Sequence, residues 1–99
     1  MFNMPNEPHN HRYGGETSYN DGHVHTYMGR TSINPDTEGH IHYFEGVTSY
    51  EDGHVHYYTD YTGPAIYIGV GHYHNYIGET KVADRHSHRF SGRTSVYRD

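Results

Sequence analysis

Cysteine and leucine are both absent from this chain of 99 residues, and aliphatic residues are too few to form a long apolar run. Without cysteine there are no disulfides and no thiolate metal sites, so imidazole and carboxylate are the strong metal ligands that remain. No segment approaches the roughly 20 apolar residues that a membrane-spanning helix requires. The N-terminus lacks a basic region followed by an apolar one, so we expect neither a membrane span nor a signal peptide. Localisation at a cell or spore surface would need an export route that the sequence does not show.

Positive charge is also scarce. The net charge is -5 with neutral histidines, and the seven Lys and Arg residues mostly stand singly, which argues against nucleic acid as a partner. Protonation of all 12 histidines would reverse the sign of the net charge. The 12 tyrosines are the largest source of buriable area, and tyrosine favours strands. A small chain with so few aliphatic residues is expected to need a metal, a partner subunit or an extended assembly.

Every histidine belongs to a His-x-His pair. Successive pairs are 14, 17, 14, 18 and 14 residues apart, which groups six units into three doublets of about 31 residues. The pairs are His9/His11, His23/His25, His40/His42, His54/His56, His72/His74 and His86/His88. A repeat of this kind is typical of a protein built from stacked copies of one unit.

Each unit reads His-x-His-x-aromatic-x-Gly-x-Thr, and this period of two residues is typical of a β-strand. The aromatic residues are Tyr13, Tyr27, Phe44, Tyr58, Tyr76 and Phe90, and the threonines are Thr17, Thr31, Thr48, Thr62, Thr80 and Thr94. We expect the repeated face of each strand to point inward. The sequence predicts an all-β fold, barrel- or sandwich-like and oligomeric, with an N-terminal arm at 1–8, a repeat domain at 9–95 and a tail at 96–99.

The glycine of the unit is replaced once, by Asp60. Glycine adopts left-handed backbone most readily and Asn or Asp are the tolerated substitutes, so we expect a positive φ at this position, in a bulge or a hairpin turn. Separate turn signals, "YNDG", "TEG" and "YEDG", place Gly22, Gly39 and Gly53 directly before a histidine pair.

Histidines at i and i+2 of a strand project to the same side, so each pair can direct two imidazoles at one metal ion. Two pairs would complete a tetrahedral site, whereas one pair with water or a carboxylate would leave an open position. We therefore predict all 12 histidines as ligands of a divalent transition metal, namely Zn, Cu or Ni. The alternative is a metal-free ladder of imidazoles that pack on the aromatic rings and hydrogen bond to the threonines.

Carboxylates stand two residues before five of the six pairs, at Glu7, Asp21, Glu38, Asp52 and Asp84. Turn chemistry is the favoured explanation, because Asp and Glu before Gly commonly begin strands. The functional alternative is a hydrogen-bond acceptor that orients a ligating imidazole.

The segments "GHVHTYMGRTS", "GHIHYFEGVTS" and "DRHSHRFSGRTS" resemble the YmaF-type family of small histidine-rich proteins of spore-forming and related bacteria, in which HxHxFxGxT units recur. The resemblance spans residues 9 to 95 and implies a repeat but no particular activity. Asp60 and the long connection from Gly63 to Gly71 depart from the pattern, so the geometry of the fourth unit is in question.

That connection, "GPAIYIGVG", is the most apolar stretch of the chain. It can cap the core or contact another subunit, through Ile66, Tyr67, Ile68 and Val70. The function that we predict is a self-assembling structural protein of a filament, appendage or spore coat, with metal-binding repeats and itself as partner. The alternative is a soluble metal buffer or sensor. An enzyme is not expected, because no nucleophile, phosphate loop or acid/base pair is present and six near-equal copies argue against one catalytic centre.

Overall fold

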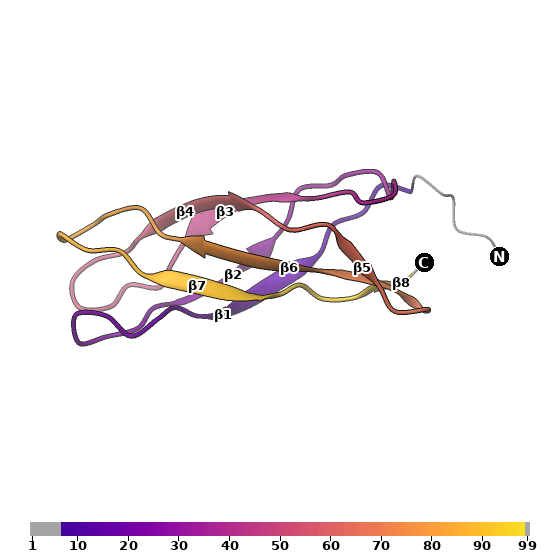
Figure 1. Ribbon diagram of the computed structural model, residues 1–99. Coiled ribbons are helices and arrows are strands. Elements are labelled where there is room, and N and C mark those ends of the chain that lie inside the picture. Colours follow the sequence, from indigo (N-terminus) through magenta and orange to yellow (C-terminus); the bar gives the residue numbers. More distant parts are fainter. Residues whose placement is uncertain (1–6, 99) are drawn as a thin grey trace.

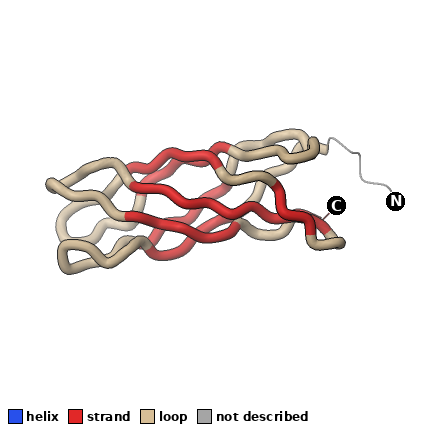
Figure 2. The backbone as a smooth tube through the Cα atoms, in the orientation of Figure 1, coloured by secondary structure: helices blue, strands red, loops and turns tan. Residues whose placement is uncertain are grey.

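The computed structural model describes residues 7–98, and this part of the chain contains strands and no helix. The strands are β1 (Arg12–Glu16), β2 (Thr26–Arg30), β3 (Tyr43–Val47), β4 (Tyr57–Tyr61), β5 (Ala65–Tyr67), β6 (Gly71–Glu79), β7 (Arg89–Arg93) and β8 (Tyr97–Arg98). The strands of the units occupy the middle of an elongated body, and β5 and β8 lie near one end of it (Figures 1 and 2). The all-β prediction is confirmed. Most of the predicted N-terminal arm, residues 1–6, and Asp99 of the predicted tail lie outside the described residues.

Each sequence doublet forms one antiparallel hairpin: β1 with β2, β3 with β4, and β6 with β7. The chain therefore runs along the body in one direction in the first unit of a doublet and returns in the second. The three hairpin tips gather at the end of the body that lies away from both termini (Figure 1). This alternation of direction decides which histidines can meet.

The hairpin tips are two-residue turns with left-handed backbone. Asp21 and Gly22 have φ angles of 53° and 86°, and Asp52 and Gly53 have 51° and 85°. Two consecutive positive φ angles define the type I′ turn, whose twist matches that of the flanking strands. The predicted turns at Gly22 and Gly53 are confirmed, and Gly39 also has a positive φ, of 70°.

The core consists of the repeated residues. The six aromatic side chains of the units are buried, and so are the six threonines and the second histidine of every pair. Each threonine hydroxyl accepts a hydrogen bond from the backbone N–H of the second histidine on the paired strand, as Thr31 Oγ1 does from His11 at 3.0 Å. The prediction that the repeated face points inward is confirmed.

The glycine of the unit is needed for space and not for a left-handed backbone, so our expectation of a positive φ there was wrong. Strand pairing sets the glycine of one strand opposite the aromatic residue of the other, as in Tyr13 with Gly29. A Cβ atom on Gly29 would lie 2.6 Å from Tyr13 Oη, because the ring crosses the glycine. Asp60 stands opposite Phe44 in the same register, and its Oδ1 accepts the N–H of Tyr61 at 2.8 Å, so the fourth unit keeps the geometry of the others.

Neighbouring hairpins are joined through the residue that follows each threonine. Ser49 N donates to Thr26 O at 2.8 Å, and Ser49 Oγ accepts from Thr26 N at 2.9 Å. The same backbone bond joins Ser18 to Arg89 and Ser95 to Arg12, which connects the third hairpin back to the first. The six strands of the units thus close around one core.

The apolar connection forms a second, smaller hairpin at the end that carries the termini. β5 pairs with the first part of β6, and β8 pairs with β6 as well. Ile68 and Val70 at its tip are 47% and 54% exposed, whereas Ile66 is half-buried. In the described part of the chain there is no helix long and apolar enough to cross a membrane.

Candidate metal centres

The antiparallel hairpins sort the histidine pairs into two groups of three. The first pair of every hairpin lies at the end of the termini, and the second pair lies at the end of the hairpin tips. The proximal cluster is His9, His11, His40, His42, His72 and His74, and the distal cluster is His23, His25, His54, His56, His86 and His88. Each hairpin therefore contributes one pair to each cluster. The sequence suggested sites of one pair or of two pairs, whereas the structure brings three pairs together.

Backbone carbonyls fix the orientation of the imidazoles. In every histidine except His72, Nδ1 lies 2.7–3.2 Å from a carbonyl oxygen; in His72 it faces Asp36 Oδ1 at 3.9 Å. A carbonyl oxygen only accepts, so Nδ1 carries the proton and, in the neutral ring, Nε2 carries the lone pair. Such bonds to the far nitrogen are the usual support of a metal-ligating histidine.

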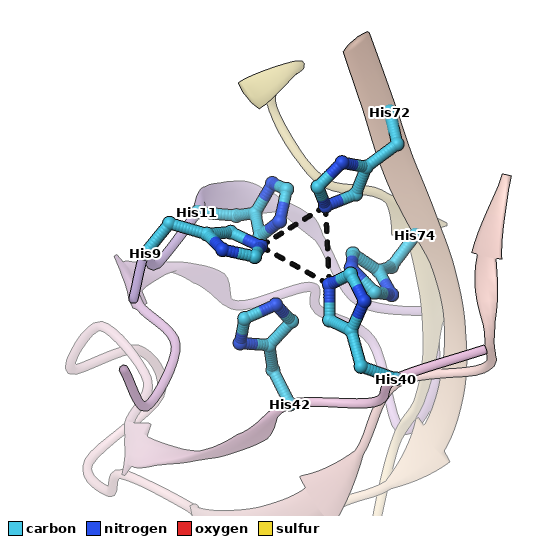
Figure 3. A group of neighbouring side chains, drawn as sticks. All are labelled: His9, His11, His40, His42, His72 and His74. Carbon is cyan, nitrogen blue, oxygen red and sulfur yellow. Dashed lines mark hydrogen bonds between the residues drawn. The ribbon is translucent and has the colours of Figure 1, made fainter. Parts of the chain in front are cut away.

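In the proximal cluster the Nε2 atoms converge. Those of His9, His40 and His72 form a triangle with sides of 3.0–3.1 Å (Figure 3). The second histidines of the pairs lie between this triangle and the aromatic core, and the Nε2 atoms of His11, His42 and His74 are buried without a hydrogen-bond partner. The threonine hydroxyls do not satisfy them, because the hydroxyls contact Nδ1 and backbone atoms.

The Nε2 atoms of the distal cluster also converge, but most of their close contacts join an outer histidine to the second histidine of a pair. Its Nε2 atoms are 3.0 Å apart between His54 and His56, 3.2 Å between His25 and His54 and between His23 and His88, and 3.3 Å between His23 and His86. The outer histidines, His23, His54 and His86, are half-buried, whereas the second histidines are fully buried.

The arrangement of nitrogens is octahedral. Ring centroids of neighbouring imidazoles are 4.6–5.2 Å apart in the proximal cluster and 4.7–5.1 Å apart in the distal one. In the distal cluster each described ring contacts four of the other five. The pairs that do not contact each other, and so occupy opposite corners, are His23 with His56, His25 with His86, and His54 with His88. Metal–nitrogen bonds of about 2.1 Å place adjacent ligands of an octahedron about 3.0 Å apart and opposite ones about 4.2 Å apart. The Nε2–Nε2 distances of 3.0–3.1 Å in the proximal triangle and of 3.0–3.3 Å along four distal edges agree with the adjacent value. All six ligand atoms of a cluster lie within 4.8 Å of one another.

The family model described as spore germination protein GerY/YamF matches residues 2–62 and, again, residues 32–96. The chain belongs to the YmaF family. The first match ends with the fourth unit and the second begins with the third, so the two overlap on the middle hairpin. Among curated proteins and solved structures, no match to the chain was found.

Burial favours the neutral imidazole in the second histidine of each pair of this YmaF-family chain. It lowers the pKa of His42 to about 3 and those of His11 and His74 to about 4, and the neighbouring histidines lower them further, against the raising effect of the carbonyl bonds. Burial also lowers the pKa of His25, His56 and His88. Neutral rings present lone pairs to one another at contact distance, and a cation between them removes that repulsion.

Three of the five predicted carboxylates lie beside the distal cluster. Asp52 Oδ2 is 3.4 Å from Nδ1 of His23, Asp84 Oδ2 is 3.6 Å from Nδ1 of His54, and Asp21 Oδ2 is 3.4 Å from Nδ1 of His86. The same three residues form the turns, as the favoured interpretation predicted, and their role in orienting a ligating imidazole stays a prediction. Of the other two, Glu7 accepts the Nδ1–H of His9 through its backbone carbonyl, and Glu38 is exposed.

Sequence reasoning missed two groups of supporting residues. Asp36 is 12% exposed, and its Oδ1 lies 3.6 Å from Nδ1 of His40. The residues after the threonines are the second group: their carbonyls accept the Nδ1–H of the second histidines, as Ser95 does from His11 at 2.8 Å. A signal for the second group was present, because Ser follows Thr in four of the six units. No periodic signal marks Asp36, which lies in a connection that occurs once.

Proposed function

We propose that this chain is a metal-binding protein that holds two divalent transition-metal ions, one at the centre of each six-histidine cluster. The observation that carries the proposal is the convergence of Nε2 lone pairs, 3.0–3.3 Å apart along the edges of an octahedron. Six buried nitrogens of which three have no partner would be costly without an ion. A metal ion at the centre would bind these Nε2 lone pairs, which the threonine hydroxyls of a metal-free ladder do not contact.

The geometry favours Ni²⁺ among the three metals that the sequence predicts. Imidazole is a good ligand for Zn, Cu, Fe and Ni, but structural Zn²⁺ sites are almost always four-coordinate. Cu²⁺ prefers a tetragonal arrangement, which six equivalent imidazoles do not provide. Co²⁺ and Fe²⁺ also accept six nitrogens, and their affinity for such ligands is lower than that of Ni²⁺.

The role that we propose for the ions is structural. Each cluster takes one pair from each of the three hairpins, so an ion at its centre ties all three together at one end of the core. A core of six aromatic side chains is small for a chain of this length. Catalytic metal sites keep a ligand position open for substrate, and six histidines leave none, so we propose that neither site is catalytic.

Self-association is the second part of the proposal. Tyr67, Ile68 and Val70 are exposed together at the tip of the small apolar hairpin. The description of the family model as a spore germination protein gives a setting in which a compact, metal-tied subunit of a larger particle would be useful. We expect Ile68→Asp with Val70→Asp to reduce the sedimentation coefficient of the native particle, whereas Ile77→Asp, equally apolar and exposed on β6, should not. Monomeric wild-type protein would favour the metal buffer or sensor.

The metal proposal is tested by titrating chelator-treated protein with Ni²⁺, Zn²⁺ and Cu²⁺ and counting bound ions by native mass spectrometry. We expect two Ni²⁺ ions per chain, and an absorption spectrum of six-coordinate nickel. His42→Ala and His56→Ala should each remove one ion. Ile41→Ala and Val55→Ala, which change the residues between the histidines of the same pairs, should keep both. The proposal would be contradicted if the wild-type chain bound no metal ion, or if all four variants bound the same number of ions.

A further inference from the structure

The two clusters have the same six ligands but different surroundings at their outer ends. At the proximal end, Tyr97 of β8 stacks on His9 with ring centroids 4.3 Å apart and an angle of 22°. The same tyrosine lies 5.9 Å from His72, and Tyr67 of β5 lies 5.7 Å from His72. The Tyr97 hydroxyl donates to Glu7 Oε1, which ties it across the mouth of the cluster. Two aromatic side chains thus cover the proximal site.

The distal end has no such cover. Its outer histidines, His23, His54 and His86, are 10–13% exposed at the side chain. Within the described chain, the aromatic rings that contact these three are other histidines of the same cluster. An open hollow lined by polar residues, including Asn20, Arg85 and Ser87, leads to His86.

Carboxylates surround that open end. Asp21, Asp52 and Asp84 are 62–66% exposed, and each lies within 3.6 Å of the outer histidine of a neighbouring hairpin. The three together form a ring of negative charge around the mouth of the distal site. The proximal cluster has Asp36 in a comparable position, and this carboxylate is only 12% exposed. A ring of one sign at the mouth of a site raises the local concentration of hydrated cations and so their rate of association.

We infer that the two metal sites differ in exchange: the distal site loads and releases its divalent ion through the ring of Asp21, Asp52 and Asp84, and the proximal site retains its ion. This inference rests on the proposed function, because it presumes that both clusters bind metal. The distal ion reaches solvent by displacing one outer imidazole. The proximal ion is released only after β8 or the β5 hairpin has moved.

The test is the rate at which chelator removes Ni²⁺ from chain loaded with two equivalents. With excess EDTA we expect two phases of equal amplitude, the faster at least about tenfold quicker, as expected when release requires local opening at only one site. His42→Ala, which leaves the distal site, should show the fast phase, and His56→Ala the slow phase. The inference would be overturned if both ions left at one rate, or if the fast phase belonged to the proximal site. Two bound ions would still support the proposed function in either case. A chain that binds no ion would contradict both the inference and the proposed function.

The wild-type chain gives the same answer if a variant folds poorly. In protein loaded with Co²⁺, the imidazole Nδ1–H protons should give two sets of hyperfine-shifted signals, and the proximal set can be assigned by its proximity to Tyr97. The distal set should disappear first when EDTA is added. Simultaneous loss would contradict the inference without any substitution.

The carboxylate ring has its own test. Asn is tolerated in left-handed turns, so the triple variant Asp21→Asn, Asp52→Asn and Asp84→Asn should keep the fold. We expect its distal site to load Ni²⁺ about tenfold more slowly at low salt, with the difference shrinking as salt is added. The control is Glu16→Gln, Glu45→Gln and Glu79→Gln, which removes the same charge from exposed strand positions. Equal loading by the two triple variants would exclude a role for the ring.

Discussion

The two ends of this molecule differ although the same repeat builds both. The distal end consists of three copies of one two-residue turn. The aspartate of each turn lies beside the outer histidine of a neighbouring hairpin, all the way around the cluster. The proximal end is formed by connections that occur once: the loop between β2 and β3 with Asp36, the β5 hairpin and β8. The repeat therefore specifies the histidines of both clusters, and the segments outside the repeat decide how well each cluster is covered.

The comparison extends to charge. Three exposed carboxylates stand around the distal histidines, whereas within residues 7–98 the carboxylate that faces the proximal histidines, Asp36, is largely buried. A bound divalent ion would thus be neutralised at the distal end by groups in water and at the proximal end by a group within the protein. Charges in water are screened by salt and buried ones much less, so the two sites should respond differently to ionic strength.

The largest effect should come from removing both ions. A structural metal site contributes on the order of 10 kcal/mol to folding, which exceeds the stability of many small domains. We expect the melting temperature of chelator-treated protein, observed by circular dichroism, to fall steeply and to recover with two equivalents of Ni²⁺. One equivalent should restore an intermediate state. An unchanged melting curve in excess chelator would show that the aromatic core suffices.

The second prediction separates the ends. All six histidines of the proximal cluster are buried, whereas the three outer histidines of the distal cluster are half-buried, so water reaches the distal imidazoles more easily once a ligand is lost. We therefore expect His74→Ala to lower the free energy of unfolding by about 4 kcal/mol and His88→Ala by about 2 kcal/mol. Denaturant unfolding of the nickel-loaded variants measures both. The controls are Asn75→Ala, at an exposed position, and Ser87→Ala, at a half-buried one, each beside one of these histidines. Equal losses at the two ends would contradict the comparison.

Much of this architecture could be predicted from the repeat, and the reasons for the failures are specific. The period of two residues predicted the strands and the buried face. The meeting of pairs in threes was missed because it depends on chain direction, although the "DG" turns imply the reversal that sends alternate pairs to opposite ends. The role of the repeated glycine was missed because its constraint is the ring of Tyr13 or its equivalents on the paired strand, which a single-strand pattern does not contain.

Acid should unfold the metal-free chain, with the proximal end as the more sensitive one. Burial lowers the pKa of His42 to about 3 and of His11 and His74 to about 4, from 6.5 in the unfolded chain. Between these values the unfolded state binds more protons, so the stability that is present above pH 6.5 is lost as pH falls toward 4. We expect the melting temperature of the metal-free chain to fall as the pH decreases from 6.5 toward 4. The control variant Ile41→Ala should show the same dependence on pH. A melting temperature independent of pH there would mean that the imidazoles are not buried in solution.

The smallest effect should come from the one distal turn that departs from its copies. Arg85 stands where Gly22 and Gly53 stand in the other turns, and its φ is 69°. Left-handed backbone costs a residue with a Cβ atom about 1–2 kcal/mol, so Arg85→Gly should raise the free energy of unfolding by about 1 kcal/mol. Arg85→Ala keeps the Cβ atom and should leave stability unchanged.

The same two variants separate backbone strain from charge. Arg85 lines the hollow that leads to His86, so loss of its positive charge should speed distal Ni²⁺ loading equally in Arg85→Gly and Arg85→Ala. Denaturant unfolding should therefore distinguish the variants, and stopped-flow loading should not. If the two measurements changed together, the turn would control access by its conformation, and the carboxylate ring would not be the reason that the distal end exchanges its ion.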